Sequence, residues 1–409
     1  MANGSACLRD RIGFQSLAAN HGRRRMSARR LWCALAMLAP LSGALAGPPC
    51  KDTDRRCLAA ACERKDFTAC NRLGNILKLG LGVAADPARA RALFEKSCAG
   101  GDAAGCAYLG GALLTGSGGE ADPARGFALC RDACDKSAPA GCNCQGAALL
   151  FGLGQEPDPV AGLTLIQKSC DDGESMACNN LGNAQLQGVG MEADPARAAE
   201  SYRQACDGGY LPACVSLAVL HREGRGASRD PALEYKLFSQ ACERGLADGC
   251  LGVGFALLSG EGARRDAARA ARMFDRACQA GSASACDNLG VLHQQGTGTK
   301  KNPAKAIPLF RRACGQKLWA ACYNLGYAMK NGLGMKADPA AAAAILGPAC
   351  EANELRACNL LGAMHHTGVG VPQNGVRATE LYRKACDGGL ETACENQKKL
   401  ETDTAAARP

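Results

Sequence analysis

Residues 178–213 read CNNLGNAQLQGVGMEADPARAAESYRQACDGGYLPA, and nine copies of this 36-residue unit run from Cys70 to Ala393. Cysteines fix the register, because the partners of each pair are 8 residues apart and successive pairs begin 36 residues apart. The ten pairs are Cys62 with Cys70, Cys98 with Cys106, Cys134 with Cys142, Cys170 with Cys178, Cys206 with Cys214, Cys242 with Cys250, Cys278 with Cys286, Cys314 with Cys322, Cys350 with Cys358, and Cys386 with Cys394. A period held without insertion or deletion predicts one structural unit that is stacked repeatedly, each copy contacting its neighbours.

The first half of the unit is typical of a helix that ends at a glycine. Leu181, Gly182 and Leu186 lie on a predicted helix of about ten residues. Gly188 ends it, because glycine accepts the left-handed backbone of a helix terminus. A second glycine follows at Gly190. Phosphate-binding loops also use G-x-G, but no strand precedes this one and it recurs in each copy, so we interpret it as a turn.

The second half of the unit opens with Asp194 and Pro195, a good N-cap residue followed by a good first helical residue. Ala199, Tyr202 and other small or aromatic residues follow at helical spacing and give this helix one apolar face. Small residues at the contacts let helices approach closely, although only 4% of the chain is aromatic. The sequence therefore predicts an all-α array of helix-turn-helix repeats.

The cysteine spacing also predicts one disulfide in each repeat. The first cysteine of a pair ends a second helix, and the second cysteine begins the next first helix after a short loop. Antiparallel helices joined by so short a loop bring the two positions within disulfide distance. Each bridge contributes roughly 2.5 kcal/mol in the chain-entropy model. The C-x7-C spacing without an adjacent histidine matches no structural zinc site.

The amino end is typical of a secretory signal. A cluster of arginines precedes the apolar run 31–46, which ends on Ala44-Leu45-Ala46. Met26 offers an alternative start, and a membrane anchor is the competing interpretation, although 16 residues are short for a spanning helix. We expect a signal over residues 1–46, a capping half-repeat over 47–69, the solenoid over 70–399 and a flexible tail over 400–409.

Removing residues 1–46 changes the charge and the cysteine count. The formal net charge falls from +9 to +3, because seven Arg and one Asp leave. Basic charge was the main argument for a nucleic-acid partner, so its loss disfavours that class of partner. The 26 cysteines fall to an even 24. An even count in an exported chain indicates disulfides in a periplasm or outside the cell.

The assembled motif, LG-x-x-[Leu/Tyr/His]-x-x-G-x-G, then D-P-x-[Arg/Lys]-A, then A-C-[Asp/Glu]-x-G, resembles the Sel-one-like repeat, a relative of the tetratricopeptide repeat. With one disulfide per copy, residues 54 to about 399 are similar to the Helicobacter cysteine-rich protein family. The resemblance implies a right-handed α/α superhelical solenoid of about nine to ten repeats that acts as an adaptor or scaffold. Some members carry the name β-lactamase for penicillin binding or weak hydrolysis.

The chemistry that a β-lactamase needs is missing from the sequence. Neither Ser-x-x-Lys nor Lys-Thr-Gly occurs, and no His-x-His or His-Glu-x-x-His metal motif occurs either. We expect no catalytic residues, no cofactor and no bound metal. A penicillin-binding protein with weak β-lactam hydrolysis stays the alternative function, and a redox reservoir is disfavoured because regular buried disulfides resist reduction.

Four cysteines lie outside the regular pairs. Cys130 occupies a position that is aromatic in most copies, and Cys144 lies two residues after Cys142. Either they form an extra bridge, or they are free thiols, buried or available to a partner. Cys50 and Cys57 precede the first complete repeat, where we favour a local bridge that seals the amino-terminal helix.

Histidines and asparagines recur at fixed repeat positions. His221, His293 and His365 stand two repeats apart, roughly 20 Å in stacked helices, so they cannot share one metal; we expect them to replace an aromatic side chain. The asparagines at the start of the first helix are the best candidates for a partner-binding concave face, because an amide can hold an extended peptide. Local hydrogen bonding at the helix start is the alternative. The face comprises Asn71, Asn143, Asn179, Asn180, Asn288, Asn324 and Asn359, together with Tyr108, Tyr323 and Tyr327.

These observations predict an exported, monomeric scaffold that binds protein or peptide partners on its concave face, with cell-wall components as a further partner class. The absence of any acid, base, nucleophile or metal set at converging positions is the main argument against an enzyme. We expect no nucleic-acid partner and no stable membrane insertion after the signal is removed.

Overall fold

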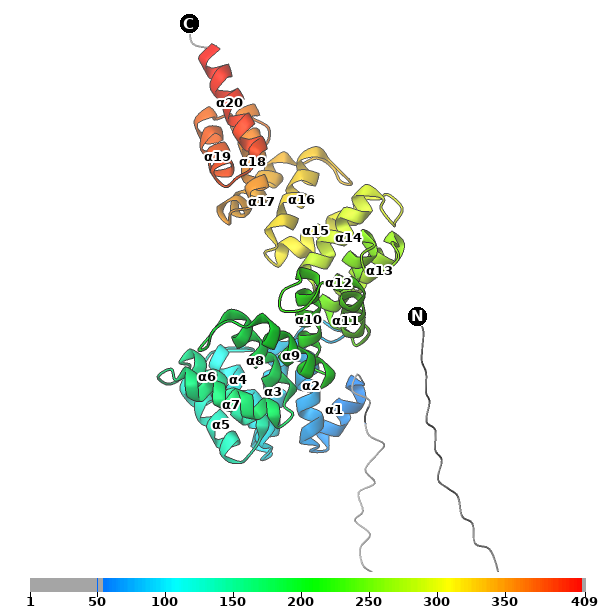
Figure 1. The fold of residues 1–409 in the computed structure, drawn as a ribbon. Helices are drawn as coiled ribbons and strands as arrows, with labels where there is room; N and C mark the ends of the chain where they lie inside the picture. The colour runs from blue at the N-terminus through cyan, green and yellow to red at the C-terminus, as the bar shows by residue number, and fades with distance from the viewer. Residues whose placement is uncertain (1–49, 51–53, 407–409) are drawn as a thin grey trace, which may run out of the picture. The chain divides into compact units, whose positions relative to one another are not determined.

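The structure is a computed structural model that describes residue 50 and residues 54–406. In these residues the chain forms twenty α-helices and no strand (Figure 1). Their bounds are α1 Arg55–Glu63, α2 Phe67–Leu79, α3 Pro87–Ala99, α4 Ala103–Thr115, α5 Pro123–Asp135, α6 Pro139–Phe151, α7 Pro159–Asp171, α8 Ser175–Gln187, α9 Pro195–Asp207, α10 Leu211–Glu223, α11 Pro231–Glu243, α12 Ala247–Ser259, α13 Ala267–Gln279, α14 Ala283–Gln295, α15 Pro303–Gly315, α16 Trp319–Asn331, α17 Pro339–Glu351, α18 Leu355–Thr367, α19 Gly375–Asp387 and α20 Glu391–Ala406. The predicted leader, residues 1–46, lies outside the described residues. Within the described residues no helix is both long and apolar enough to cross a bilayer.

Each repeat is a pair of antiparallel helices whose ends are set by the predicted cap residues. The even-numbered helix comes first, and in α8 it ends at Gly188, which has a left-handed backbone with φ of 71°. The odd-numbered helix follows, and in α9 the side chain of Asp194 accepts the backbone N–H groups of Ala196 and Arg197. Helices that are adjacent in the chain pack against each other along the array. The predicted solenoid of helix-turn-helix repeats is therefore confirmed.

The core is built from large side chains of the odd-numbered helices that fill gaps opened by glycines of the even-numbered helices. Phe274 is fully buried, and a Cβ on Gly254 would lie 2.3 Å from its ring. Tyr382 packs in the same way against Gly362, and Ile166 against Gly146. Such close approach explains how a chain with few aromatic residues buries a continuous core.

Twelve disulfides are present in the described residues, and ten of them follow the repeat. Their Cα–Cα distances lie between 4.3 and 4.8 Å. They bond Cys62 with Cys70, Cys98 with Cys106, Cys134 with Cys142, Cys170 with Cys178, Cys206 with Cys214, Cys242 with Cys250, Cys278 with Cys286, Cys314 with Cys322, Cys350 with Cys358, and Cys386 with Cys394. These are the ten pairs that the cysteine spacing predicts.

The two remaining disulfides join Cys50 to Cys57 and Cys130 to Cys144. The first is the local bridge favoured from the sequence, and the second is the extra bridge that was one of the open alternatives. Cys130 is fully buried in a cluster with Leu114, so its bridge occupies core space that an aromatic ring fills in other repeats. So many bridges indicate an oxidising environment, periplasmic or extracellular.

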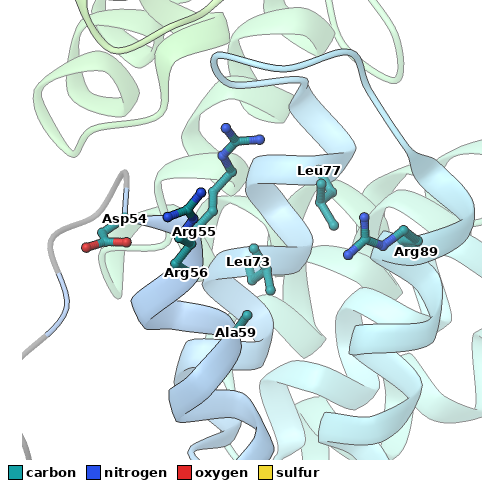
Figure 2. A pocket seen from close by; sticks show the side chains of 7 residues that line it. All are labelled: Asp54, Arg55, Arg56, Ala59, Leu73, Leu77 and Arg89. Carbon is teal, nitrogen blue, oxygen red and sulfur yellow. The ribbon is translucent and has the colours of Figure 1, made fainter.

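A cavity lies beside α1, which has 9 residues, whereas the other odd-numbered helices have 13. Those helices begin at positions 87, 123 and every 36 residues onward, which would place a start at residue 51, but α1 begins at Arg55. The cavity, of about 660 Å³, lies between α1, α2 and α3 (Figure 2). Leu73 and Leu77 form its floor, and Arg89 lies at its edge. We interpret this cavity as a gap in the helix stack.

The loop that follows α2 makes a contact far along the chain. The backbone N–H of Gly82 donates to the carbonyl oxygen of Gly245 over 2.9 Å. Leu81 packs on Leu211 and Leu246, so this loop lies beside the start of α10 (Figure 1). In most other repeats the equivalent glycine lies against the start of the preceding odd-numbered helix, whereas no atom lies within 4 Å of a Cβ built on Gly82. We call the contact between residues 81–82 and residues 211, 245 and 246 the clasp.

The carboxyl end differs from the expected tail. Residues 400–409 were predicted to be flexible, but α20 continues to Ala406 and buries Leu400 against Ala378 and Tyr382. The repeat pattern ends near residue 399, whereas the helix extends beyond it because nothing in Glu401 to Ala406 breaks a helix.

Candidate binding groove

The even-numbered helices form the inner wall of the array. Helix α4 packs on both α2 and α6, α6 on α8, and α18 on both α16 and α20. Among the described residues, no odd-numbered helix makes contact of the same extent with the next odd-numbered helix. The helices that approach each other most closely lie on the inside of a bend, so the even-numbered helices face the concave side.

Three cavities follow this inner wall through the first half of the array, and they share residues. The first, about 390 Å³, is the chamber, lined by Arg72, Tyr108, Glu174, Met176, Tyr210 and Arg244 among others. The second, about 130 Å³, also contacts Tyr108 and Met176. The third, about 110 Å³, shares Asn180 with the second and reaches Phe151, which is 60% exposed. We call the three together the groove.

The chamber holds one carboxylate near two phenols. Glu174 and Tyr210 precede α8 and α10, and neither side chain makes a cap hydrogen bond. Burial raises the pKa of Glu174. Burial, and then the nearby Glu174 charge, raise the pKa values of Tyr108 and Tyr210, whereas a hydrogen bond with Asn75 opposes the shift at Tyr108. The sequence prediction included Tyr108 but missed Glu174 and Tyr210.

The second cavity contains a lysine. Lys78 lines the cavity and is exposed along part of its side chain, and partial burial lowers the pKa of its ammonium group. The rest of the lining is mainly apolar and includes Leu114, Leu153 and Cys144 of the extra disulfide. In the described part of the chain, no acidic side chain lies within 4.0 Å of the ammonium group of Lys78.

The predicted asparagine face is only partly accessible. Asn71, Asn143 and Asn179 are at least 92% buried. Asn71 donates to Asp102 over 3.1 Å. Asn143 reaches the edge of the second cavity. These three therefore offer little surface to a partner, and a binding role for this face stays a prediction.

The partly exposed asparagines join one repeat to the next. Asn180 donates to Asn143 over 2.9 Å and Asn324 to Asp287 over 2.8 Å, each across 37 positions. A third pair has Asn396 donating to Asn359 over 2.8 Å. Asn288 has Leu251 at the partner position and donates instead to the carbonyl of Ser284 over 2.7 Å. The three bonds across 37 positions join neighbouring repeats, a role that neither sequence interpretation included, whereas the bond of Asn288 is the local hydrogen bonding that was the alternative.

A second cluster lies on the inner wall farther along. The rings of Tyr323 and Tyr327 on α16 have centroids 6.2 Å apart, and Tyr327 is 41% exposed. The guanidinium of Arg356 lies 4.7 Å from the centroid of Tyr323 and pairs with Glu354 over 2.7 Å. Burial raises the pKa of the nearby Asp287. The cluster offers an aromatic surface flanked by charges of both signs.

The histidines are packing residues. His221 and His365 occupy the position of leucines such as Leu113, not that of an aromatic residue as expected. His221 Nδ1 donates to the carbonyl of Ser228 over 2.9 Å, and His365 Nδ1 donates to that of Pro372 over 3.3 Å. Each histidine thus ties a helix end to the loop that follows. In residues 50 and 54–406 no group of three or more His, Cys, Asp or Glu could hold a metal ion.

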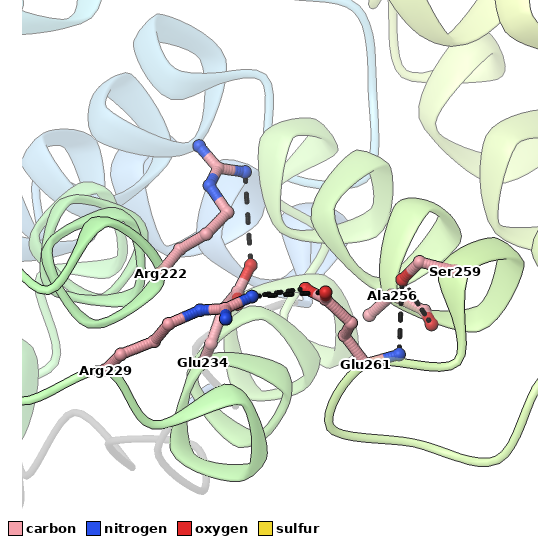
Figure 3. A network of polar contacts seen from close by, with 6 residues as sticks. All are labelled: Arg222, Arg229, Glu234, Ala256, Ser259 and Glu261. Atoms are coloured by element: carbon pink, nitrogen blue, oxygen red, sulfur yellow. Dashed lines mark hydrogen bonds and ion pairs between the residues drawn. The ribbon is translucent and has the colours of Figure 1, made fainter.

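A buried acid on α11 gives one prediction (Figure 3). Glu234 is 7% exposed and lies 3.9 Å from Arg222, whereas Glu261 pairs with Arg229 over 3.1 Å in the open. Burial raises the pKa of Glu234, against the opposing charge of Arg222. A carboxyl whose pKa is higher in the folded state binds more protons there, so its ionisation lowers stability as pH rises through that pKa.

Glu234→Gln is therefore expected to raise the thermal midpoint relative to the wild type at pH 7, with the difference shrinking toward pH 4. Paired melts followed by circular dichroism across this range measure the effect. Glu261→Gln is the matched control and should show no such gain at neutral pH, because that carboxylate is exposed. A gain for Glu234→Gln that is the same at both pH values would contradict the assignment.

A family model described as the Sel1 repeat matches nine segments of the chain. They are residues 68–102, 103–137, 146–174, 175–210, 211–246, 247–282, 283–317, 319–354 and 355–390. Each segment from residue 175 onward runs through an even-numbered helix and the odd-numbered helix that follows it. No curated protein matches the sequence significantly.

Solved structures with a similar chain include three bacterial proteins. The Sel1 repeat protein from Oxalobacter formigenes is 21% identical over 75% of this chain and 89% of its own, with a TM-score of 0.57. A protective antigen present in uropathogenic Escherichia coli strains is 25% identical over 85% of this chain and 82% of its own, with a TM-score of 0.41. Helicobacter pylori cysteine rich protein B is 24% identical over 31% of this chain and 91% of its own, with a TM-score of 0.26. With nine matched repeats, the chain belongs to the Sel1 repeat family.

Proposed function

We propose that this protein is an exported scaffold that binds a protein or peptide partner along the inner wall of its even-numbered helices. The observation that carries the proposal is the groove, a row of linked cavities that runs across α2, α4, α6 and α8. The inner wall also exposes Phe151 and Tyr327, and aromatic residues are enriched at protein interfaces.

Export is part of the same proposal. The disulfides need an oxidising compartment, and the arginine-rich, apolar residues 1–46 are the candidate signal. A phosphatase that is active only when oxidised, fused after residue 60, should show activity in intact bacteria. Deletion of residues 1–46 from that fusion should abolish the activity, and activity that survives the deletion would contradict the signal assignment.

Peptide binding can be tested with a displayed library of random extended peptides and the purified oxidised protein. We expect enrichment of peptides whose affinity falls at least tenfold with Phe151→Ala or Tyr327→Ala, because exposed aromatic residues dominate such interfaces. Fluorescence titration of a selected peptide measures the change. Neither variant should alter the thermal midpoint, since both side chains are substantially exposed.

Exposed valines on odd-numbered helices give a matched control. Val160 on α7 and Val376 on α19 are both 74% exposed. Val160→Ala and Val376→Ala should leave peptide affinity unchanged. Equal losses from the valine and the aromatic variants, or no enrichment at all, would show that the inner wall is not the binding surface.

A further inference from the structure

The chamber is assembled from repeats that are far apart in the sequence. Leu79 and Leu81 line it from the loop after α2, and Gly209, Tyr210 and Arg244 line it from the loops around α10 and α11. These are the segments that the clasp joins. The chamber therefore exists only while the clasp is closed, and its ligand can be distinguished from one that binds elsewhere on the inner wall.

The acidic lining residue of the chamber, Glu174, favours a cation. Glu174 is a partly buried carboxylate, and among residues 50 and 54–406 no Lys, Arg or His nitrogen lies within 4.0 Å of it. Tyr108 and Tyr210 line the same cavity, and each interacts electrostatically with the carboxylate of Glu174. Aromatic faces attract cations, and a desolvated carboxylate is stabilised by an opposite charge.

Another lining residue of the chamber, Arg244, favours an anion. Arg244 lines the chamber and donates one hydrogen bond, to the carbonyl oxygen of Gly209 over 3.3 Å. A guanidinium has five N–H donors in a planar fork, so Arg244 can still hold a carboxylate with two parallel bonds. Arg72 also lines the chamber and donates to the carbonyl oxygen of Cys50 over 3.1 Å.

We propose that the chamber binds a short peptide with a free ammonium group and a free carboxylate. Glu174, with Tyr108 and Tyr210 in the same lining, holds the ammonium group, and Arg244 holds the carboxylate. The cavity of about 390 Å³ is at the lower end of the range for small ligands, about 300 to 1,000 Å³, which suits two or three residues. The assignment deepens the proposed function, on which it rests, by naming a ligand class for one part of the groove.

Three forms of one dipeptide test the assignment with the full oxidised chain. Lysyl-alanine carries both charges, its diacetylated form lacks the ammonium groups, and its amide lacks the carboxylate. By calorimetric titration we expect each modified form to bind at least tenfold more weakly than the free dipeptide. Glu174→Gln should weaken the free dipeptide at least tenfold without weakening the diacetylated form further. Arg244→Gln should weaken the free dipeptide at least tenfold without weakening the amide further, as a double-mutant cycle requires.

The clasp provides a second, independent test. A Cβ on Gly245 would lie 2.6 Å from the nitrogen of Gly82, whereas Gly389, with nearly the same φ, 95° against 93°, has no atom within 4 Å of such a Cβ. Gly245→Ala should open the clasp and weaken the free dipeptide at least tenfold, and Gly389→Ala should leave its affinity unchanged.

The outcomes separate the chamber from the wider groove. Dipeptide affinity that is the same in Glu174→Gln, in Arg244→Gln and in the wild type would overturn the chamber assignment, as would no measurable binding of the free dipeptide. If library peptides still bind and still respond to Phe151→Ala, the proposed function stands and only the chamber assignment fails. If library peptides do not bind either, both fail.

Discussion

Chemical reduction is expected to unfold this protein at physiological temperature. Closing a loop of about nine residues stabilises the folded state by roughly 2.6 kcal/mol in the chain-entropy model, and twelve bridges together give roughly 30 kcal/mol. That exceeds the 5 to 15 kcal/mol by which folded domains are typically stable. Far-ultraviolet circular dichroism with and without a phosphine reductant should show loss of most of the helical signal.

Removal of a single bridge tests the same idea on one repeat. Cys278→Ala together with Cys286→Ala, in the middle of the array, should cost about 2 to 5 kcal/mol and lower the midpoint of the whole transition. The terminal pair, Cys50→Ala with Cys57→Ala, should have a smaller effect, because only one neighbouring repeat depends on it. A reduced wild type with full helicity and an unchanged midpoint would show that helix packing alone holds the array.

Gly262→Ala is expected to be strongly destabilising. Gly262 has a left-handed backbone with φ of 72°, and a Cβ there would lie 1.9 Å from the carbonyl oxygen of Pro231, at the start of α11. The left-handed conformation costs about 1 to 2 kcal/mol for a residue with a Cβ, and overpacking adds about 1 to 3 kcal/mol. The total is about 2 to 5 kcal/mol, measured by urea denaturation.

Gly82→Ala is the matched control for that substitution. Gly82 occupies the same turn position with φ of 69°, but no atom lies within 4 Å of a Cβ built there. Its cost should be limited to about 1 to 2 kcal/mol for the conformation itself. If Gly82→Ala and Gly262→Ala are equally destabilising, the close approach to α11 contributes nothing, and the turn alone explains why glycine occupies this position.

The local structure of each repeat could be predicted because its determinants lie close together in the chain. Asp194 caps α9 and Gly188 ends α8 through bonds that span a few residues, and Cys206 meets Cys214 across one short loop. Such signals recur in each copy, so the period reinforces them. Export and partner binding stay predictions, because they depend on contacts outside this chain.

The groove could not be predicted in the same way. Gly82 contacts Gly245 because small rotations between successive repeats accumulate over several units. The total rotation cannot be predicted from the sequence of any single repeat. A weaker signal was available for Glu174 and Tyr210, which stand where Asp66 and Asp102 cap their helices but do not cap. The recurrence of asparagine at fixed positions correctly indicated that these residues have a specific role. It could not distinguish a hydrogen bond to the next repeat from a hydrogen bond to a ligand.

The clasp also constrains the number of repeats between the two segments that it joins. It joins positions 82 and 245, which are about four and a half units apart. Insertion or deletion of one unit between them would move Gly245 away from Gly82 and break the contact. No comparable long-range contact joins the repeats after residue 300 in the described part of the chain. Relatives of this protein should therefore conserve repeat number in the first half and vary it in the second, as units are duplicated or lost during evolution.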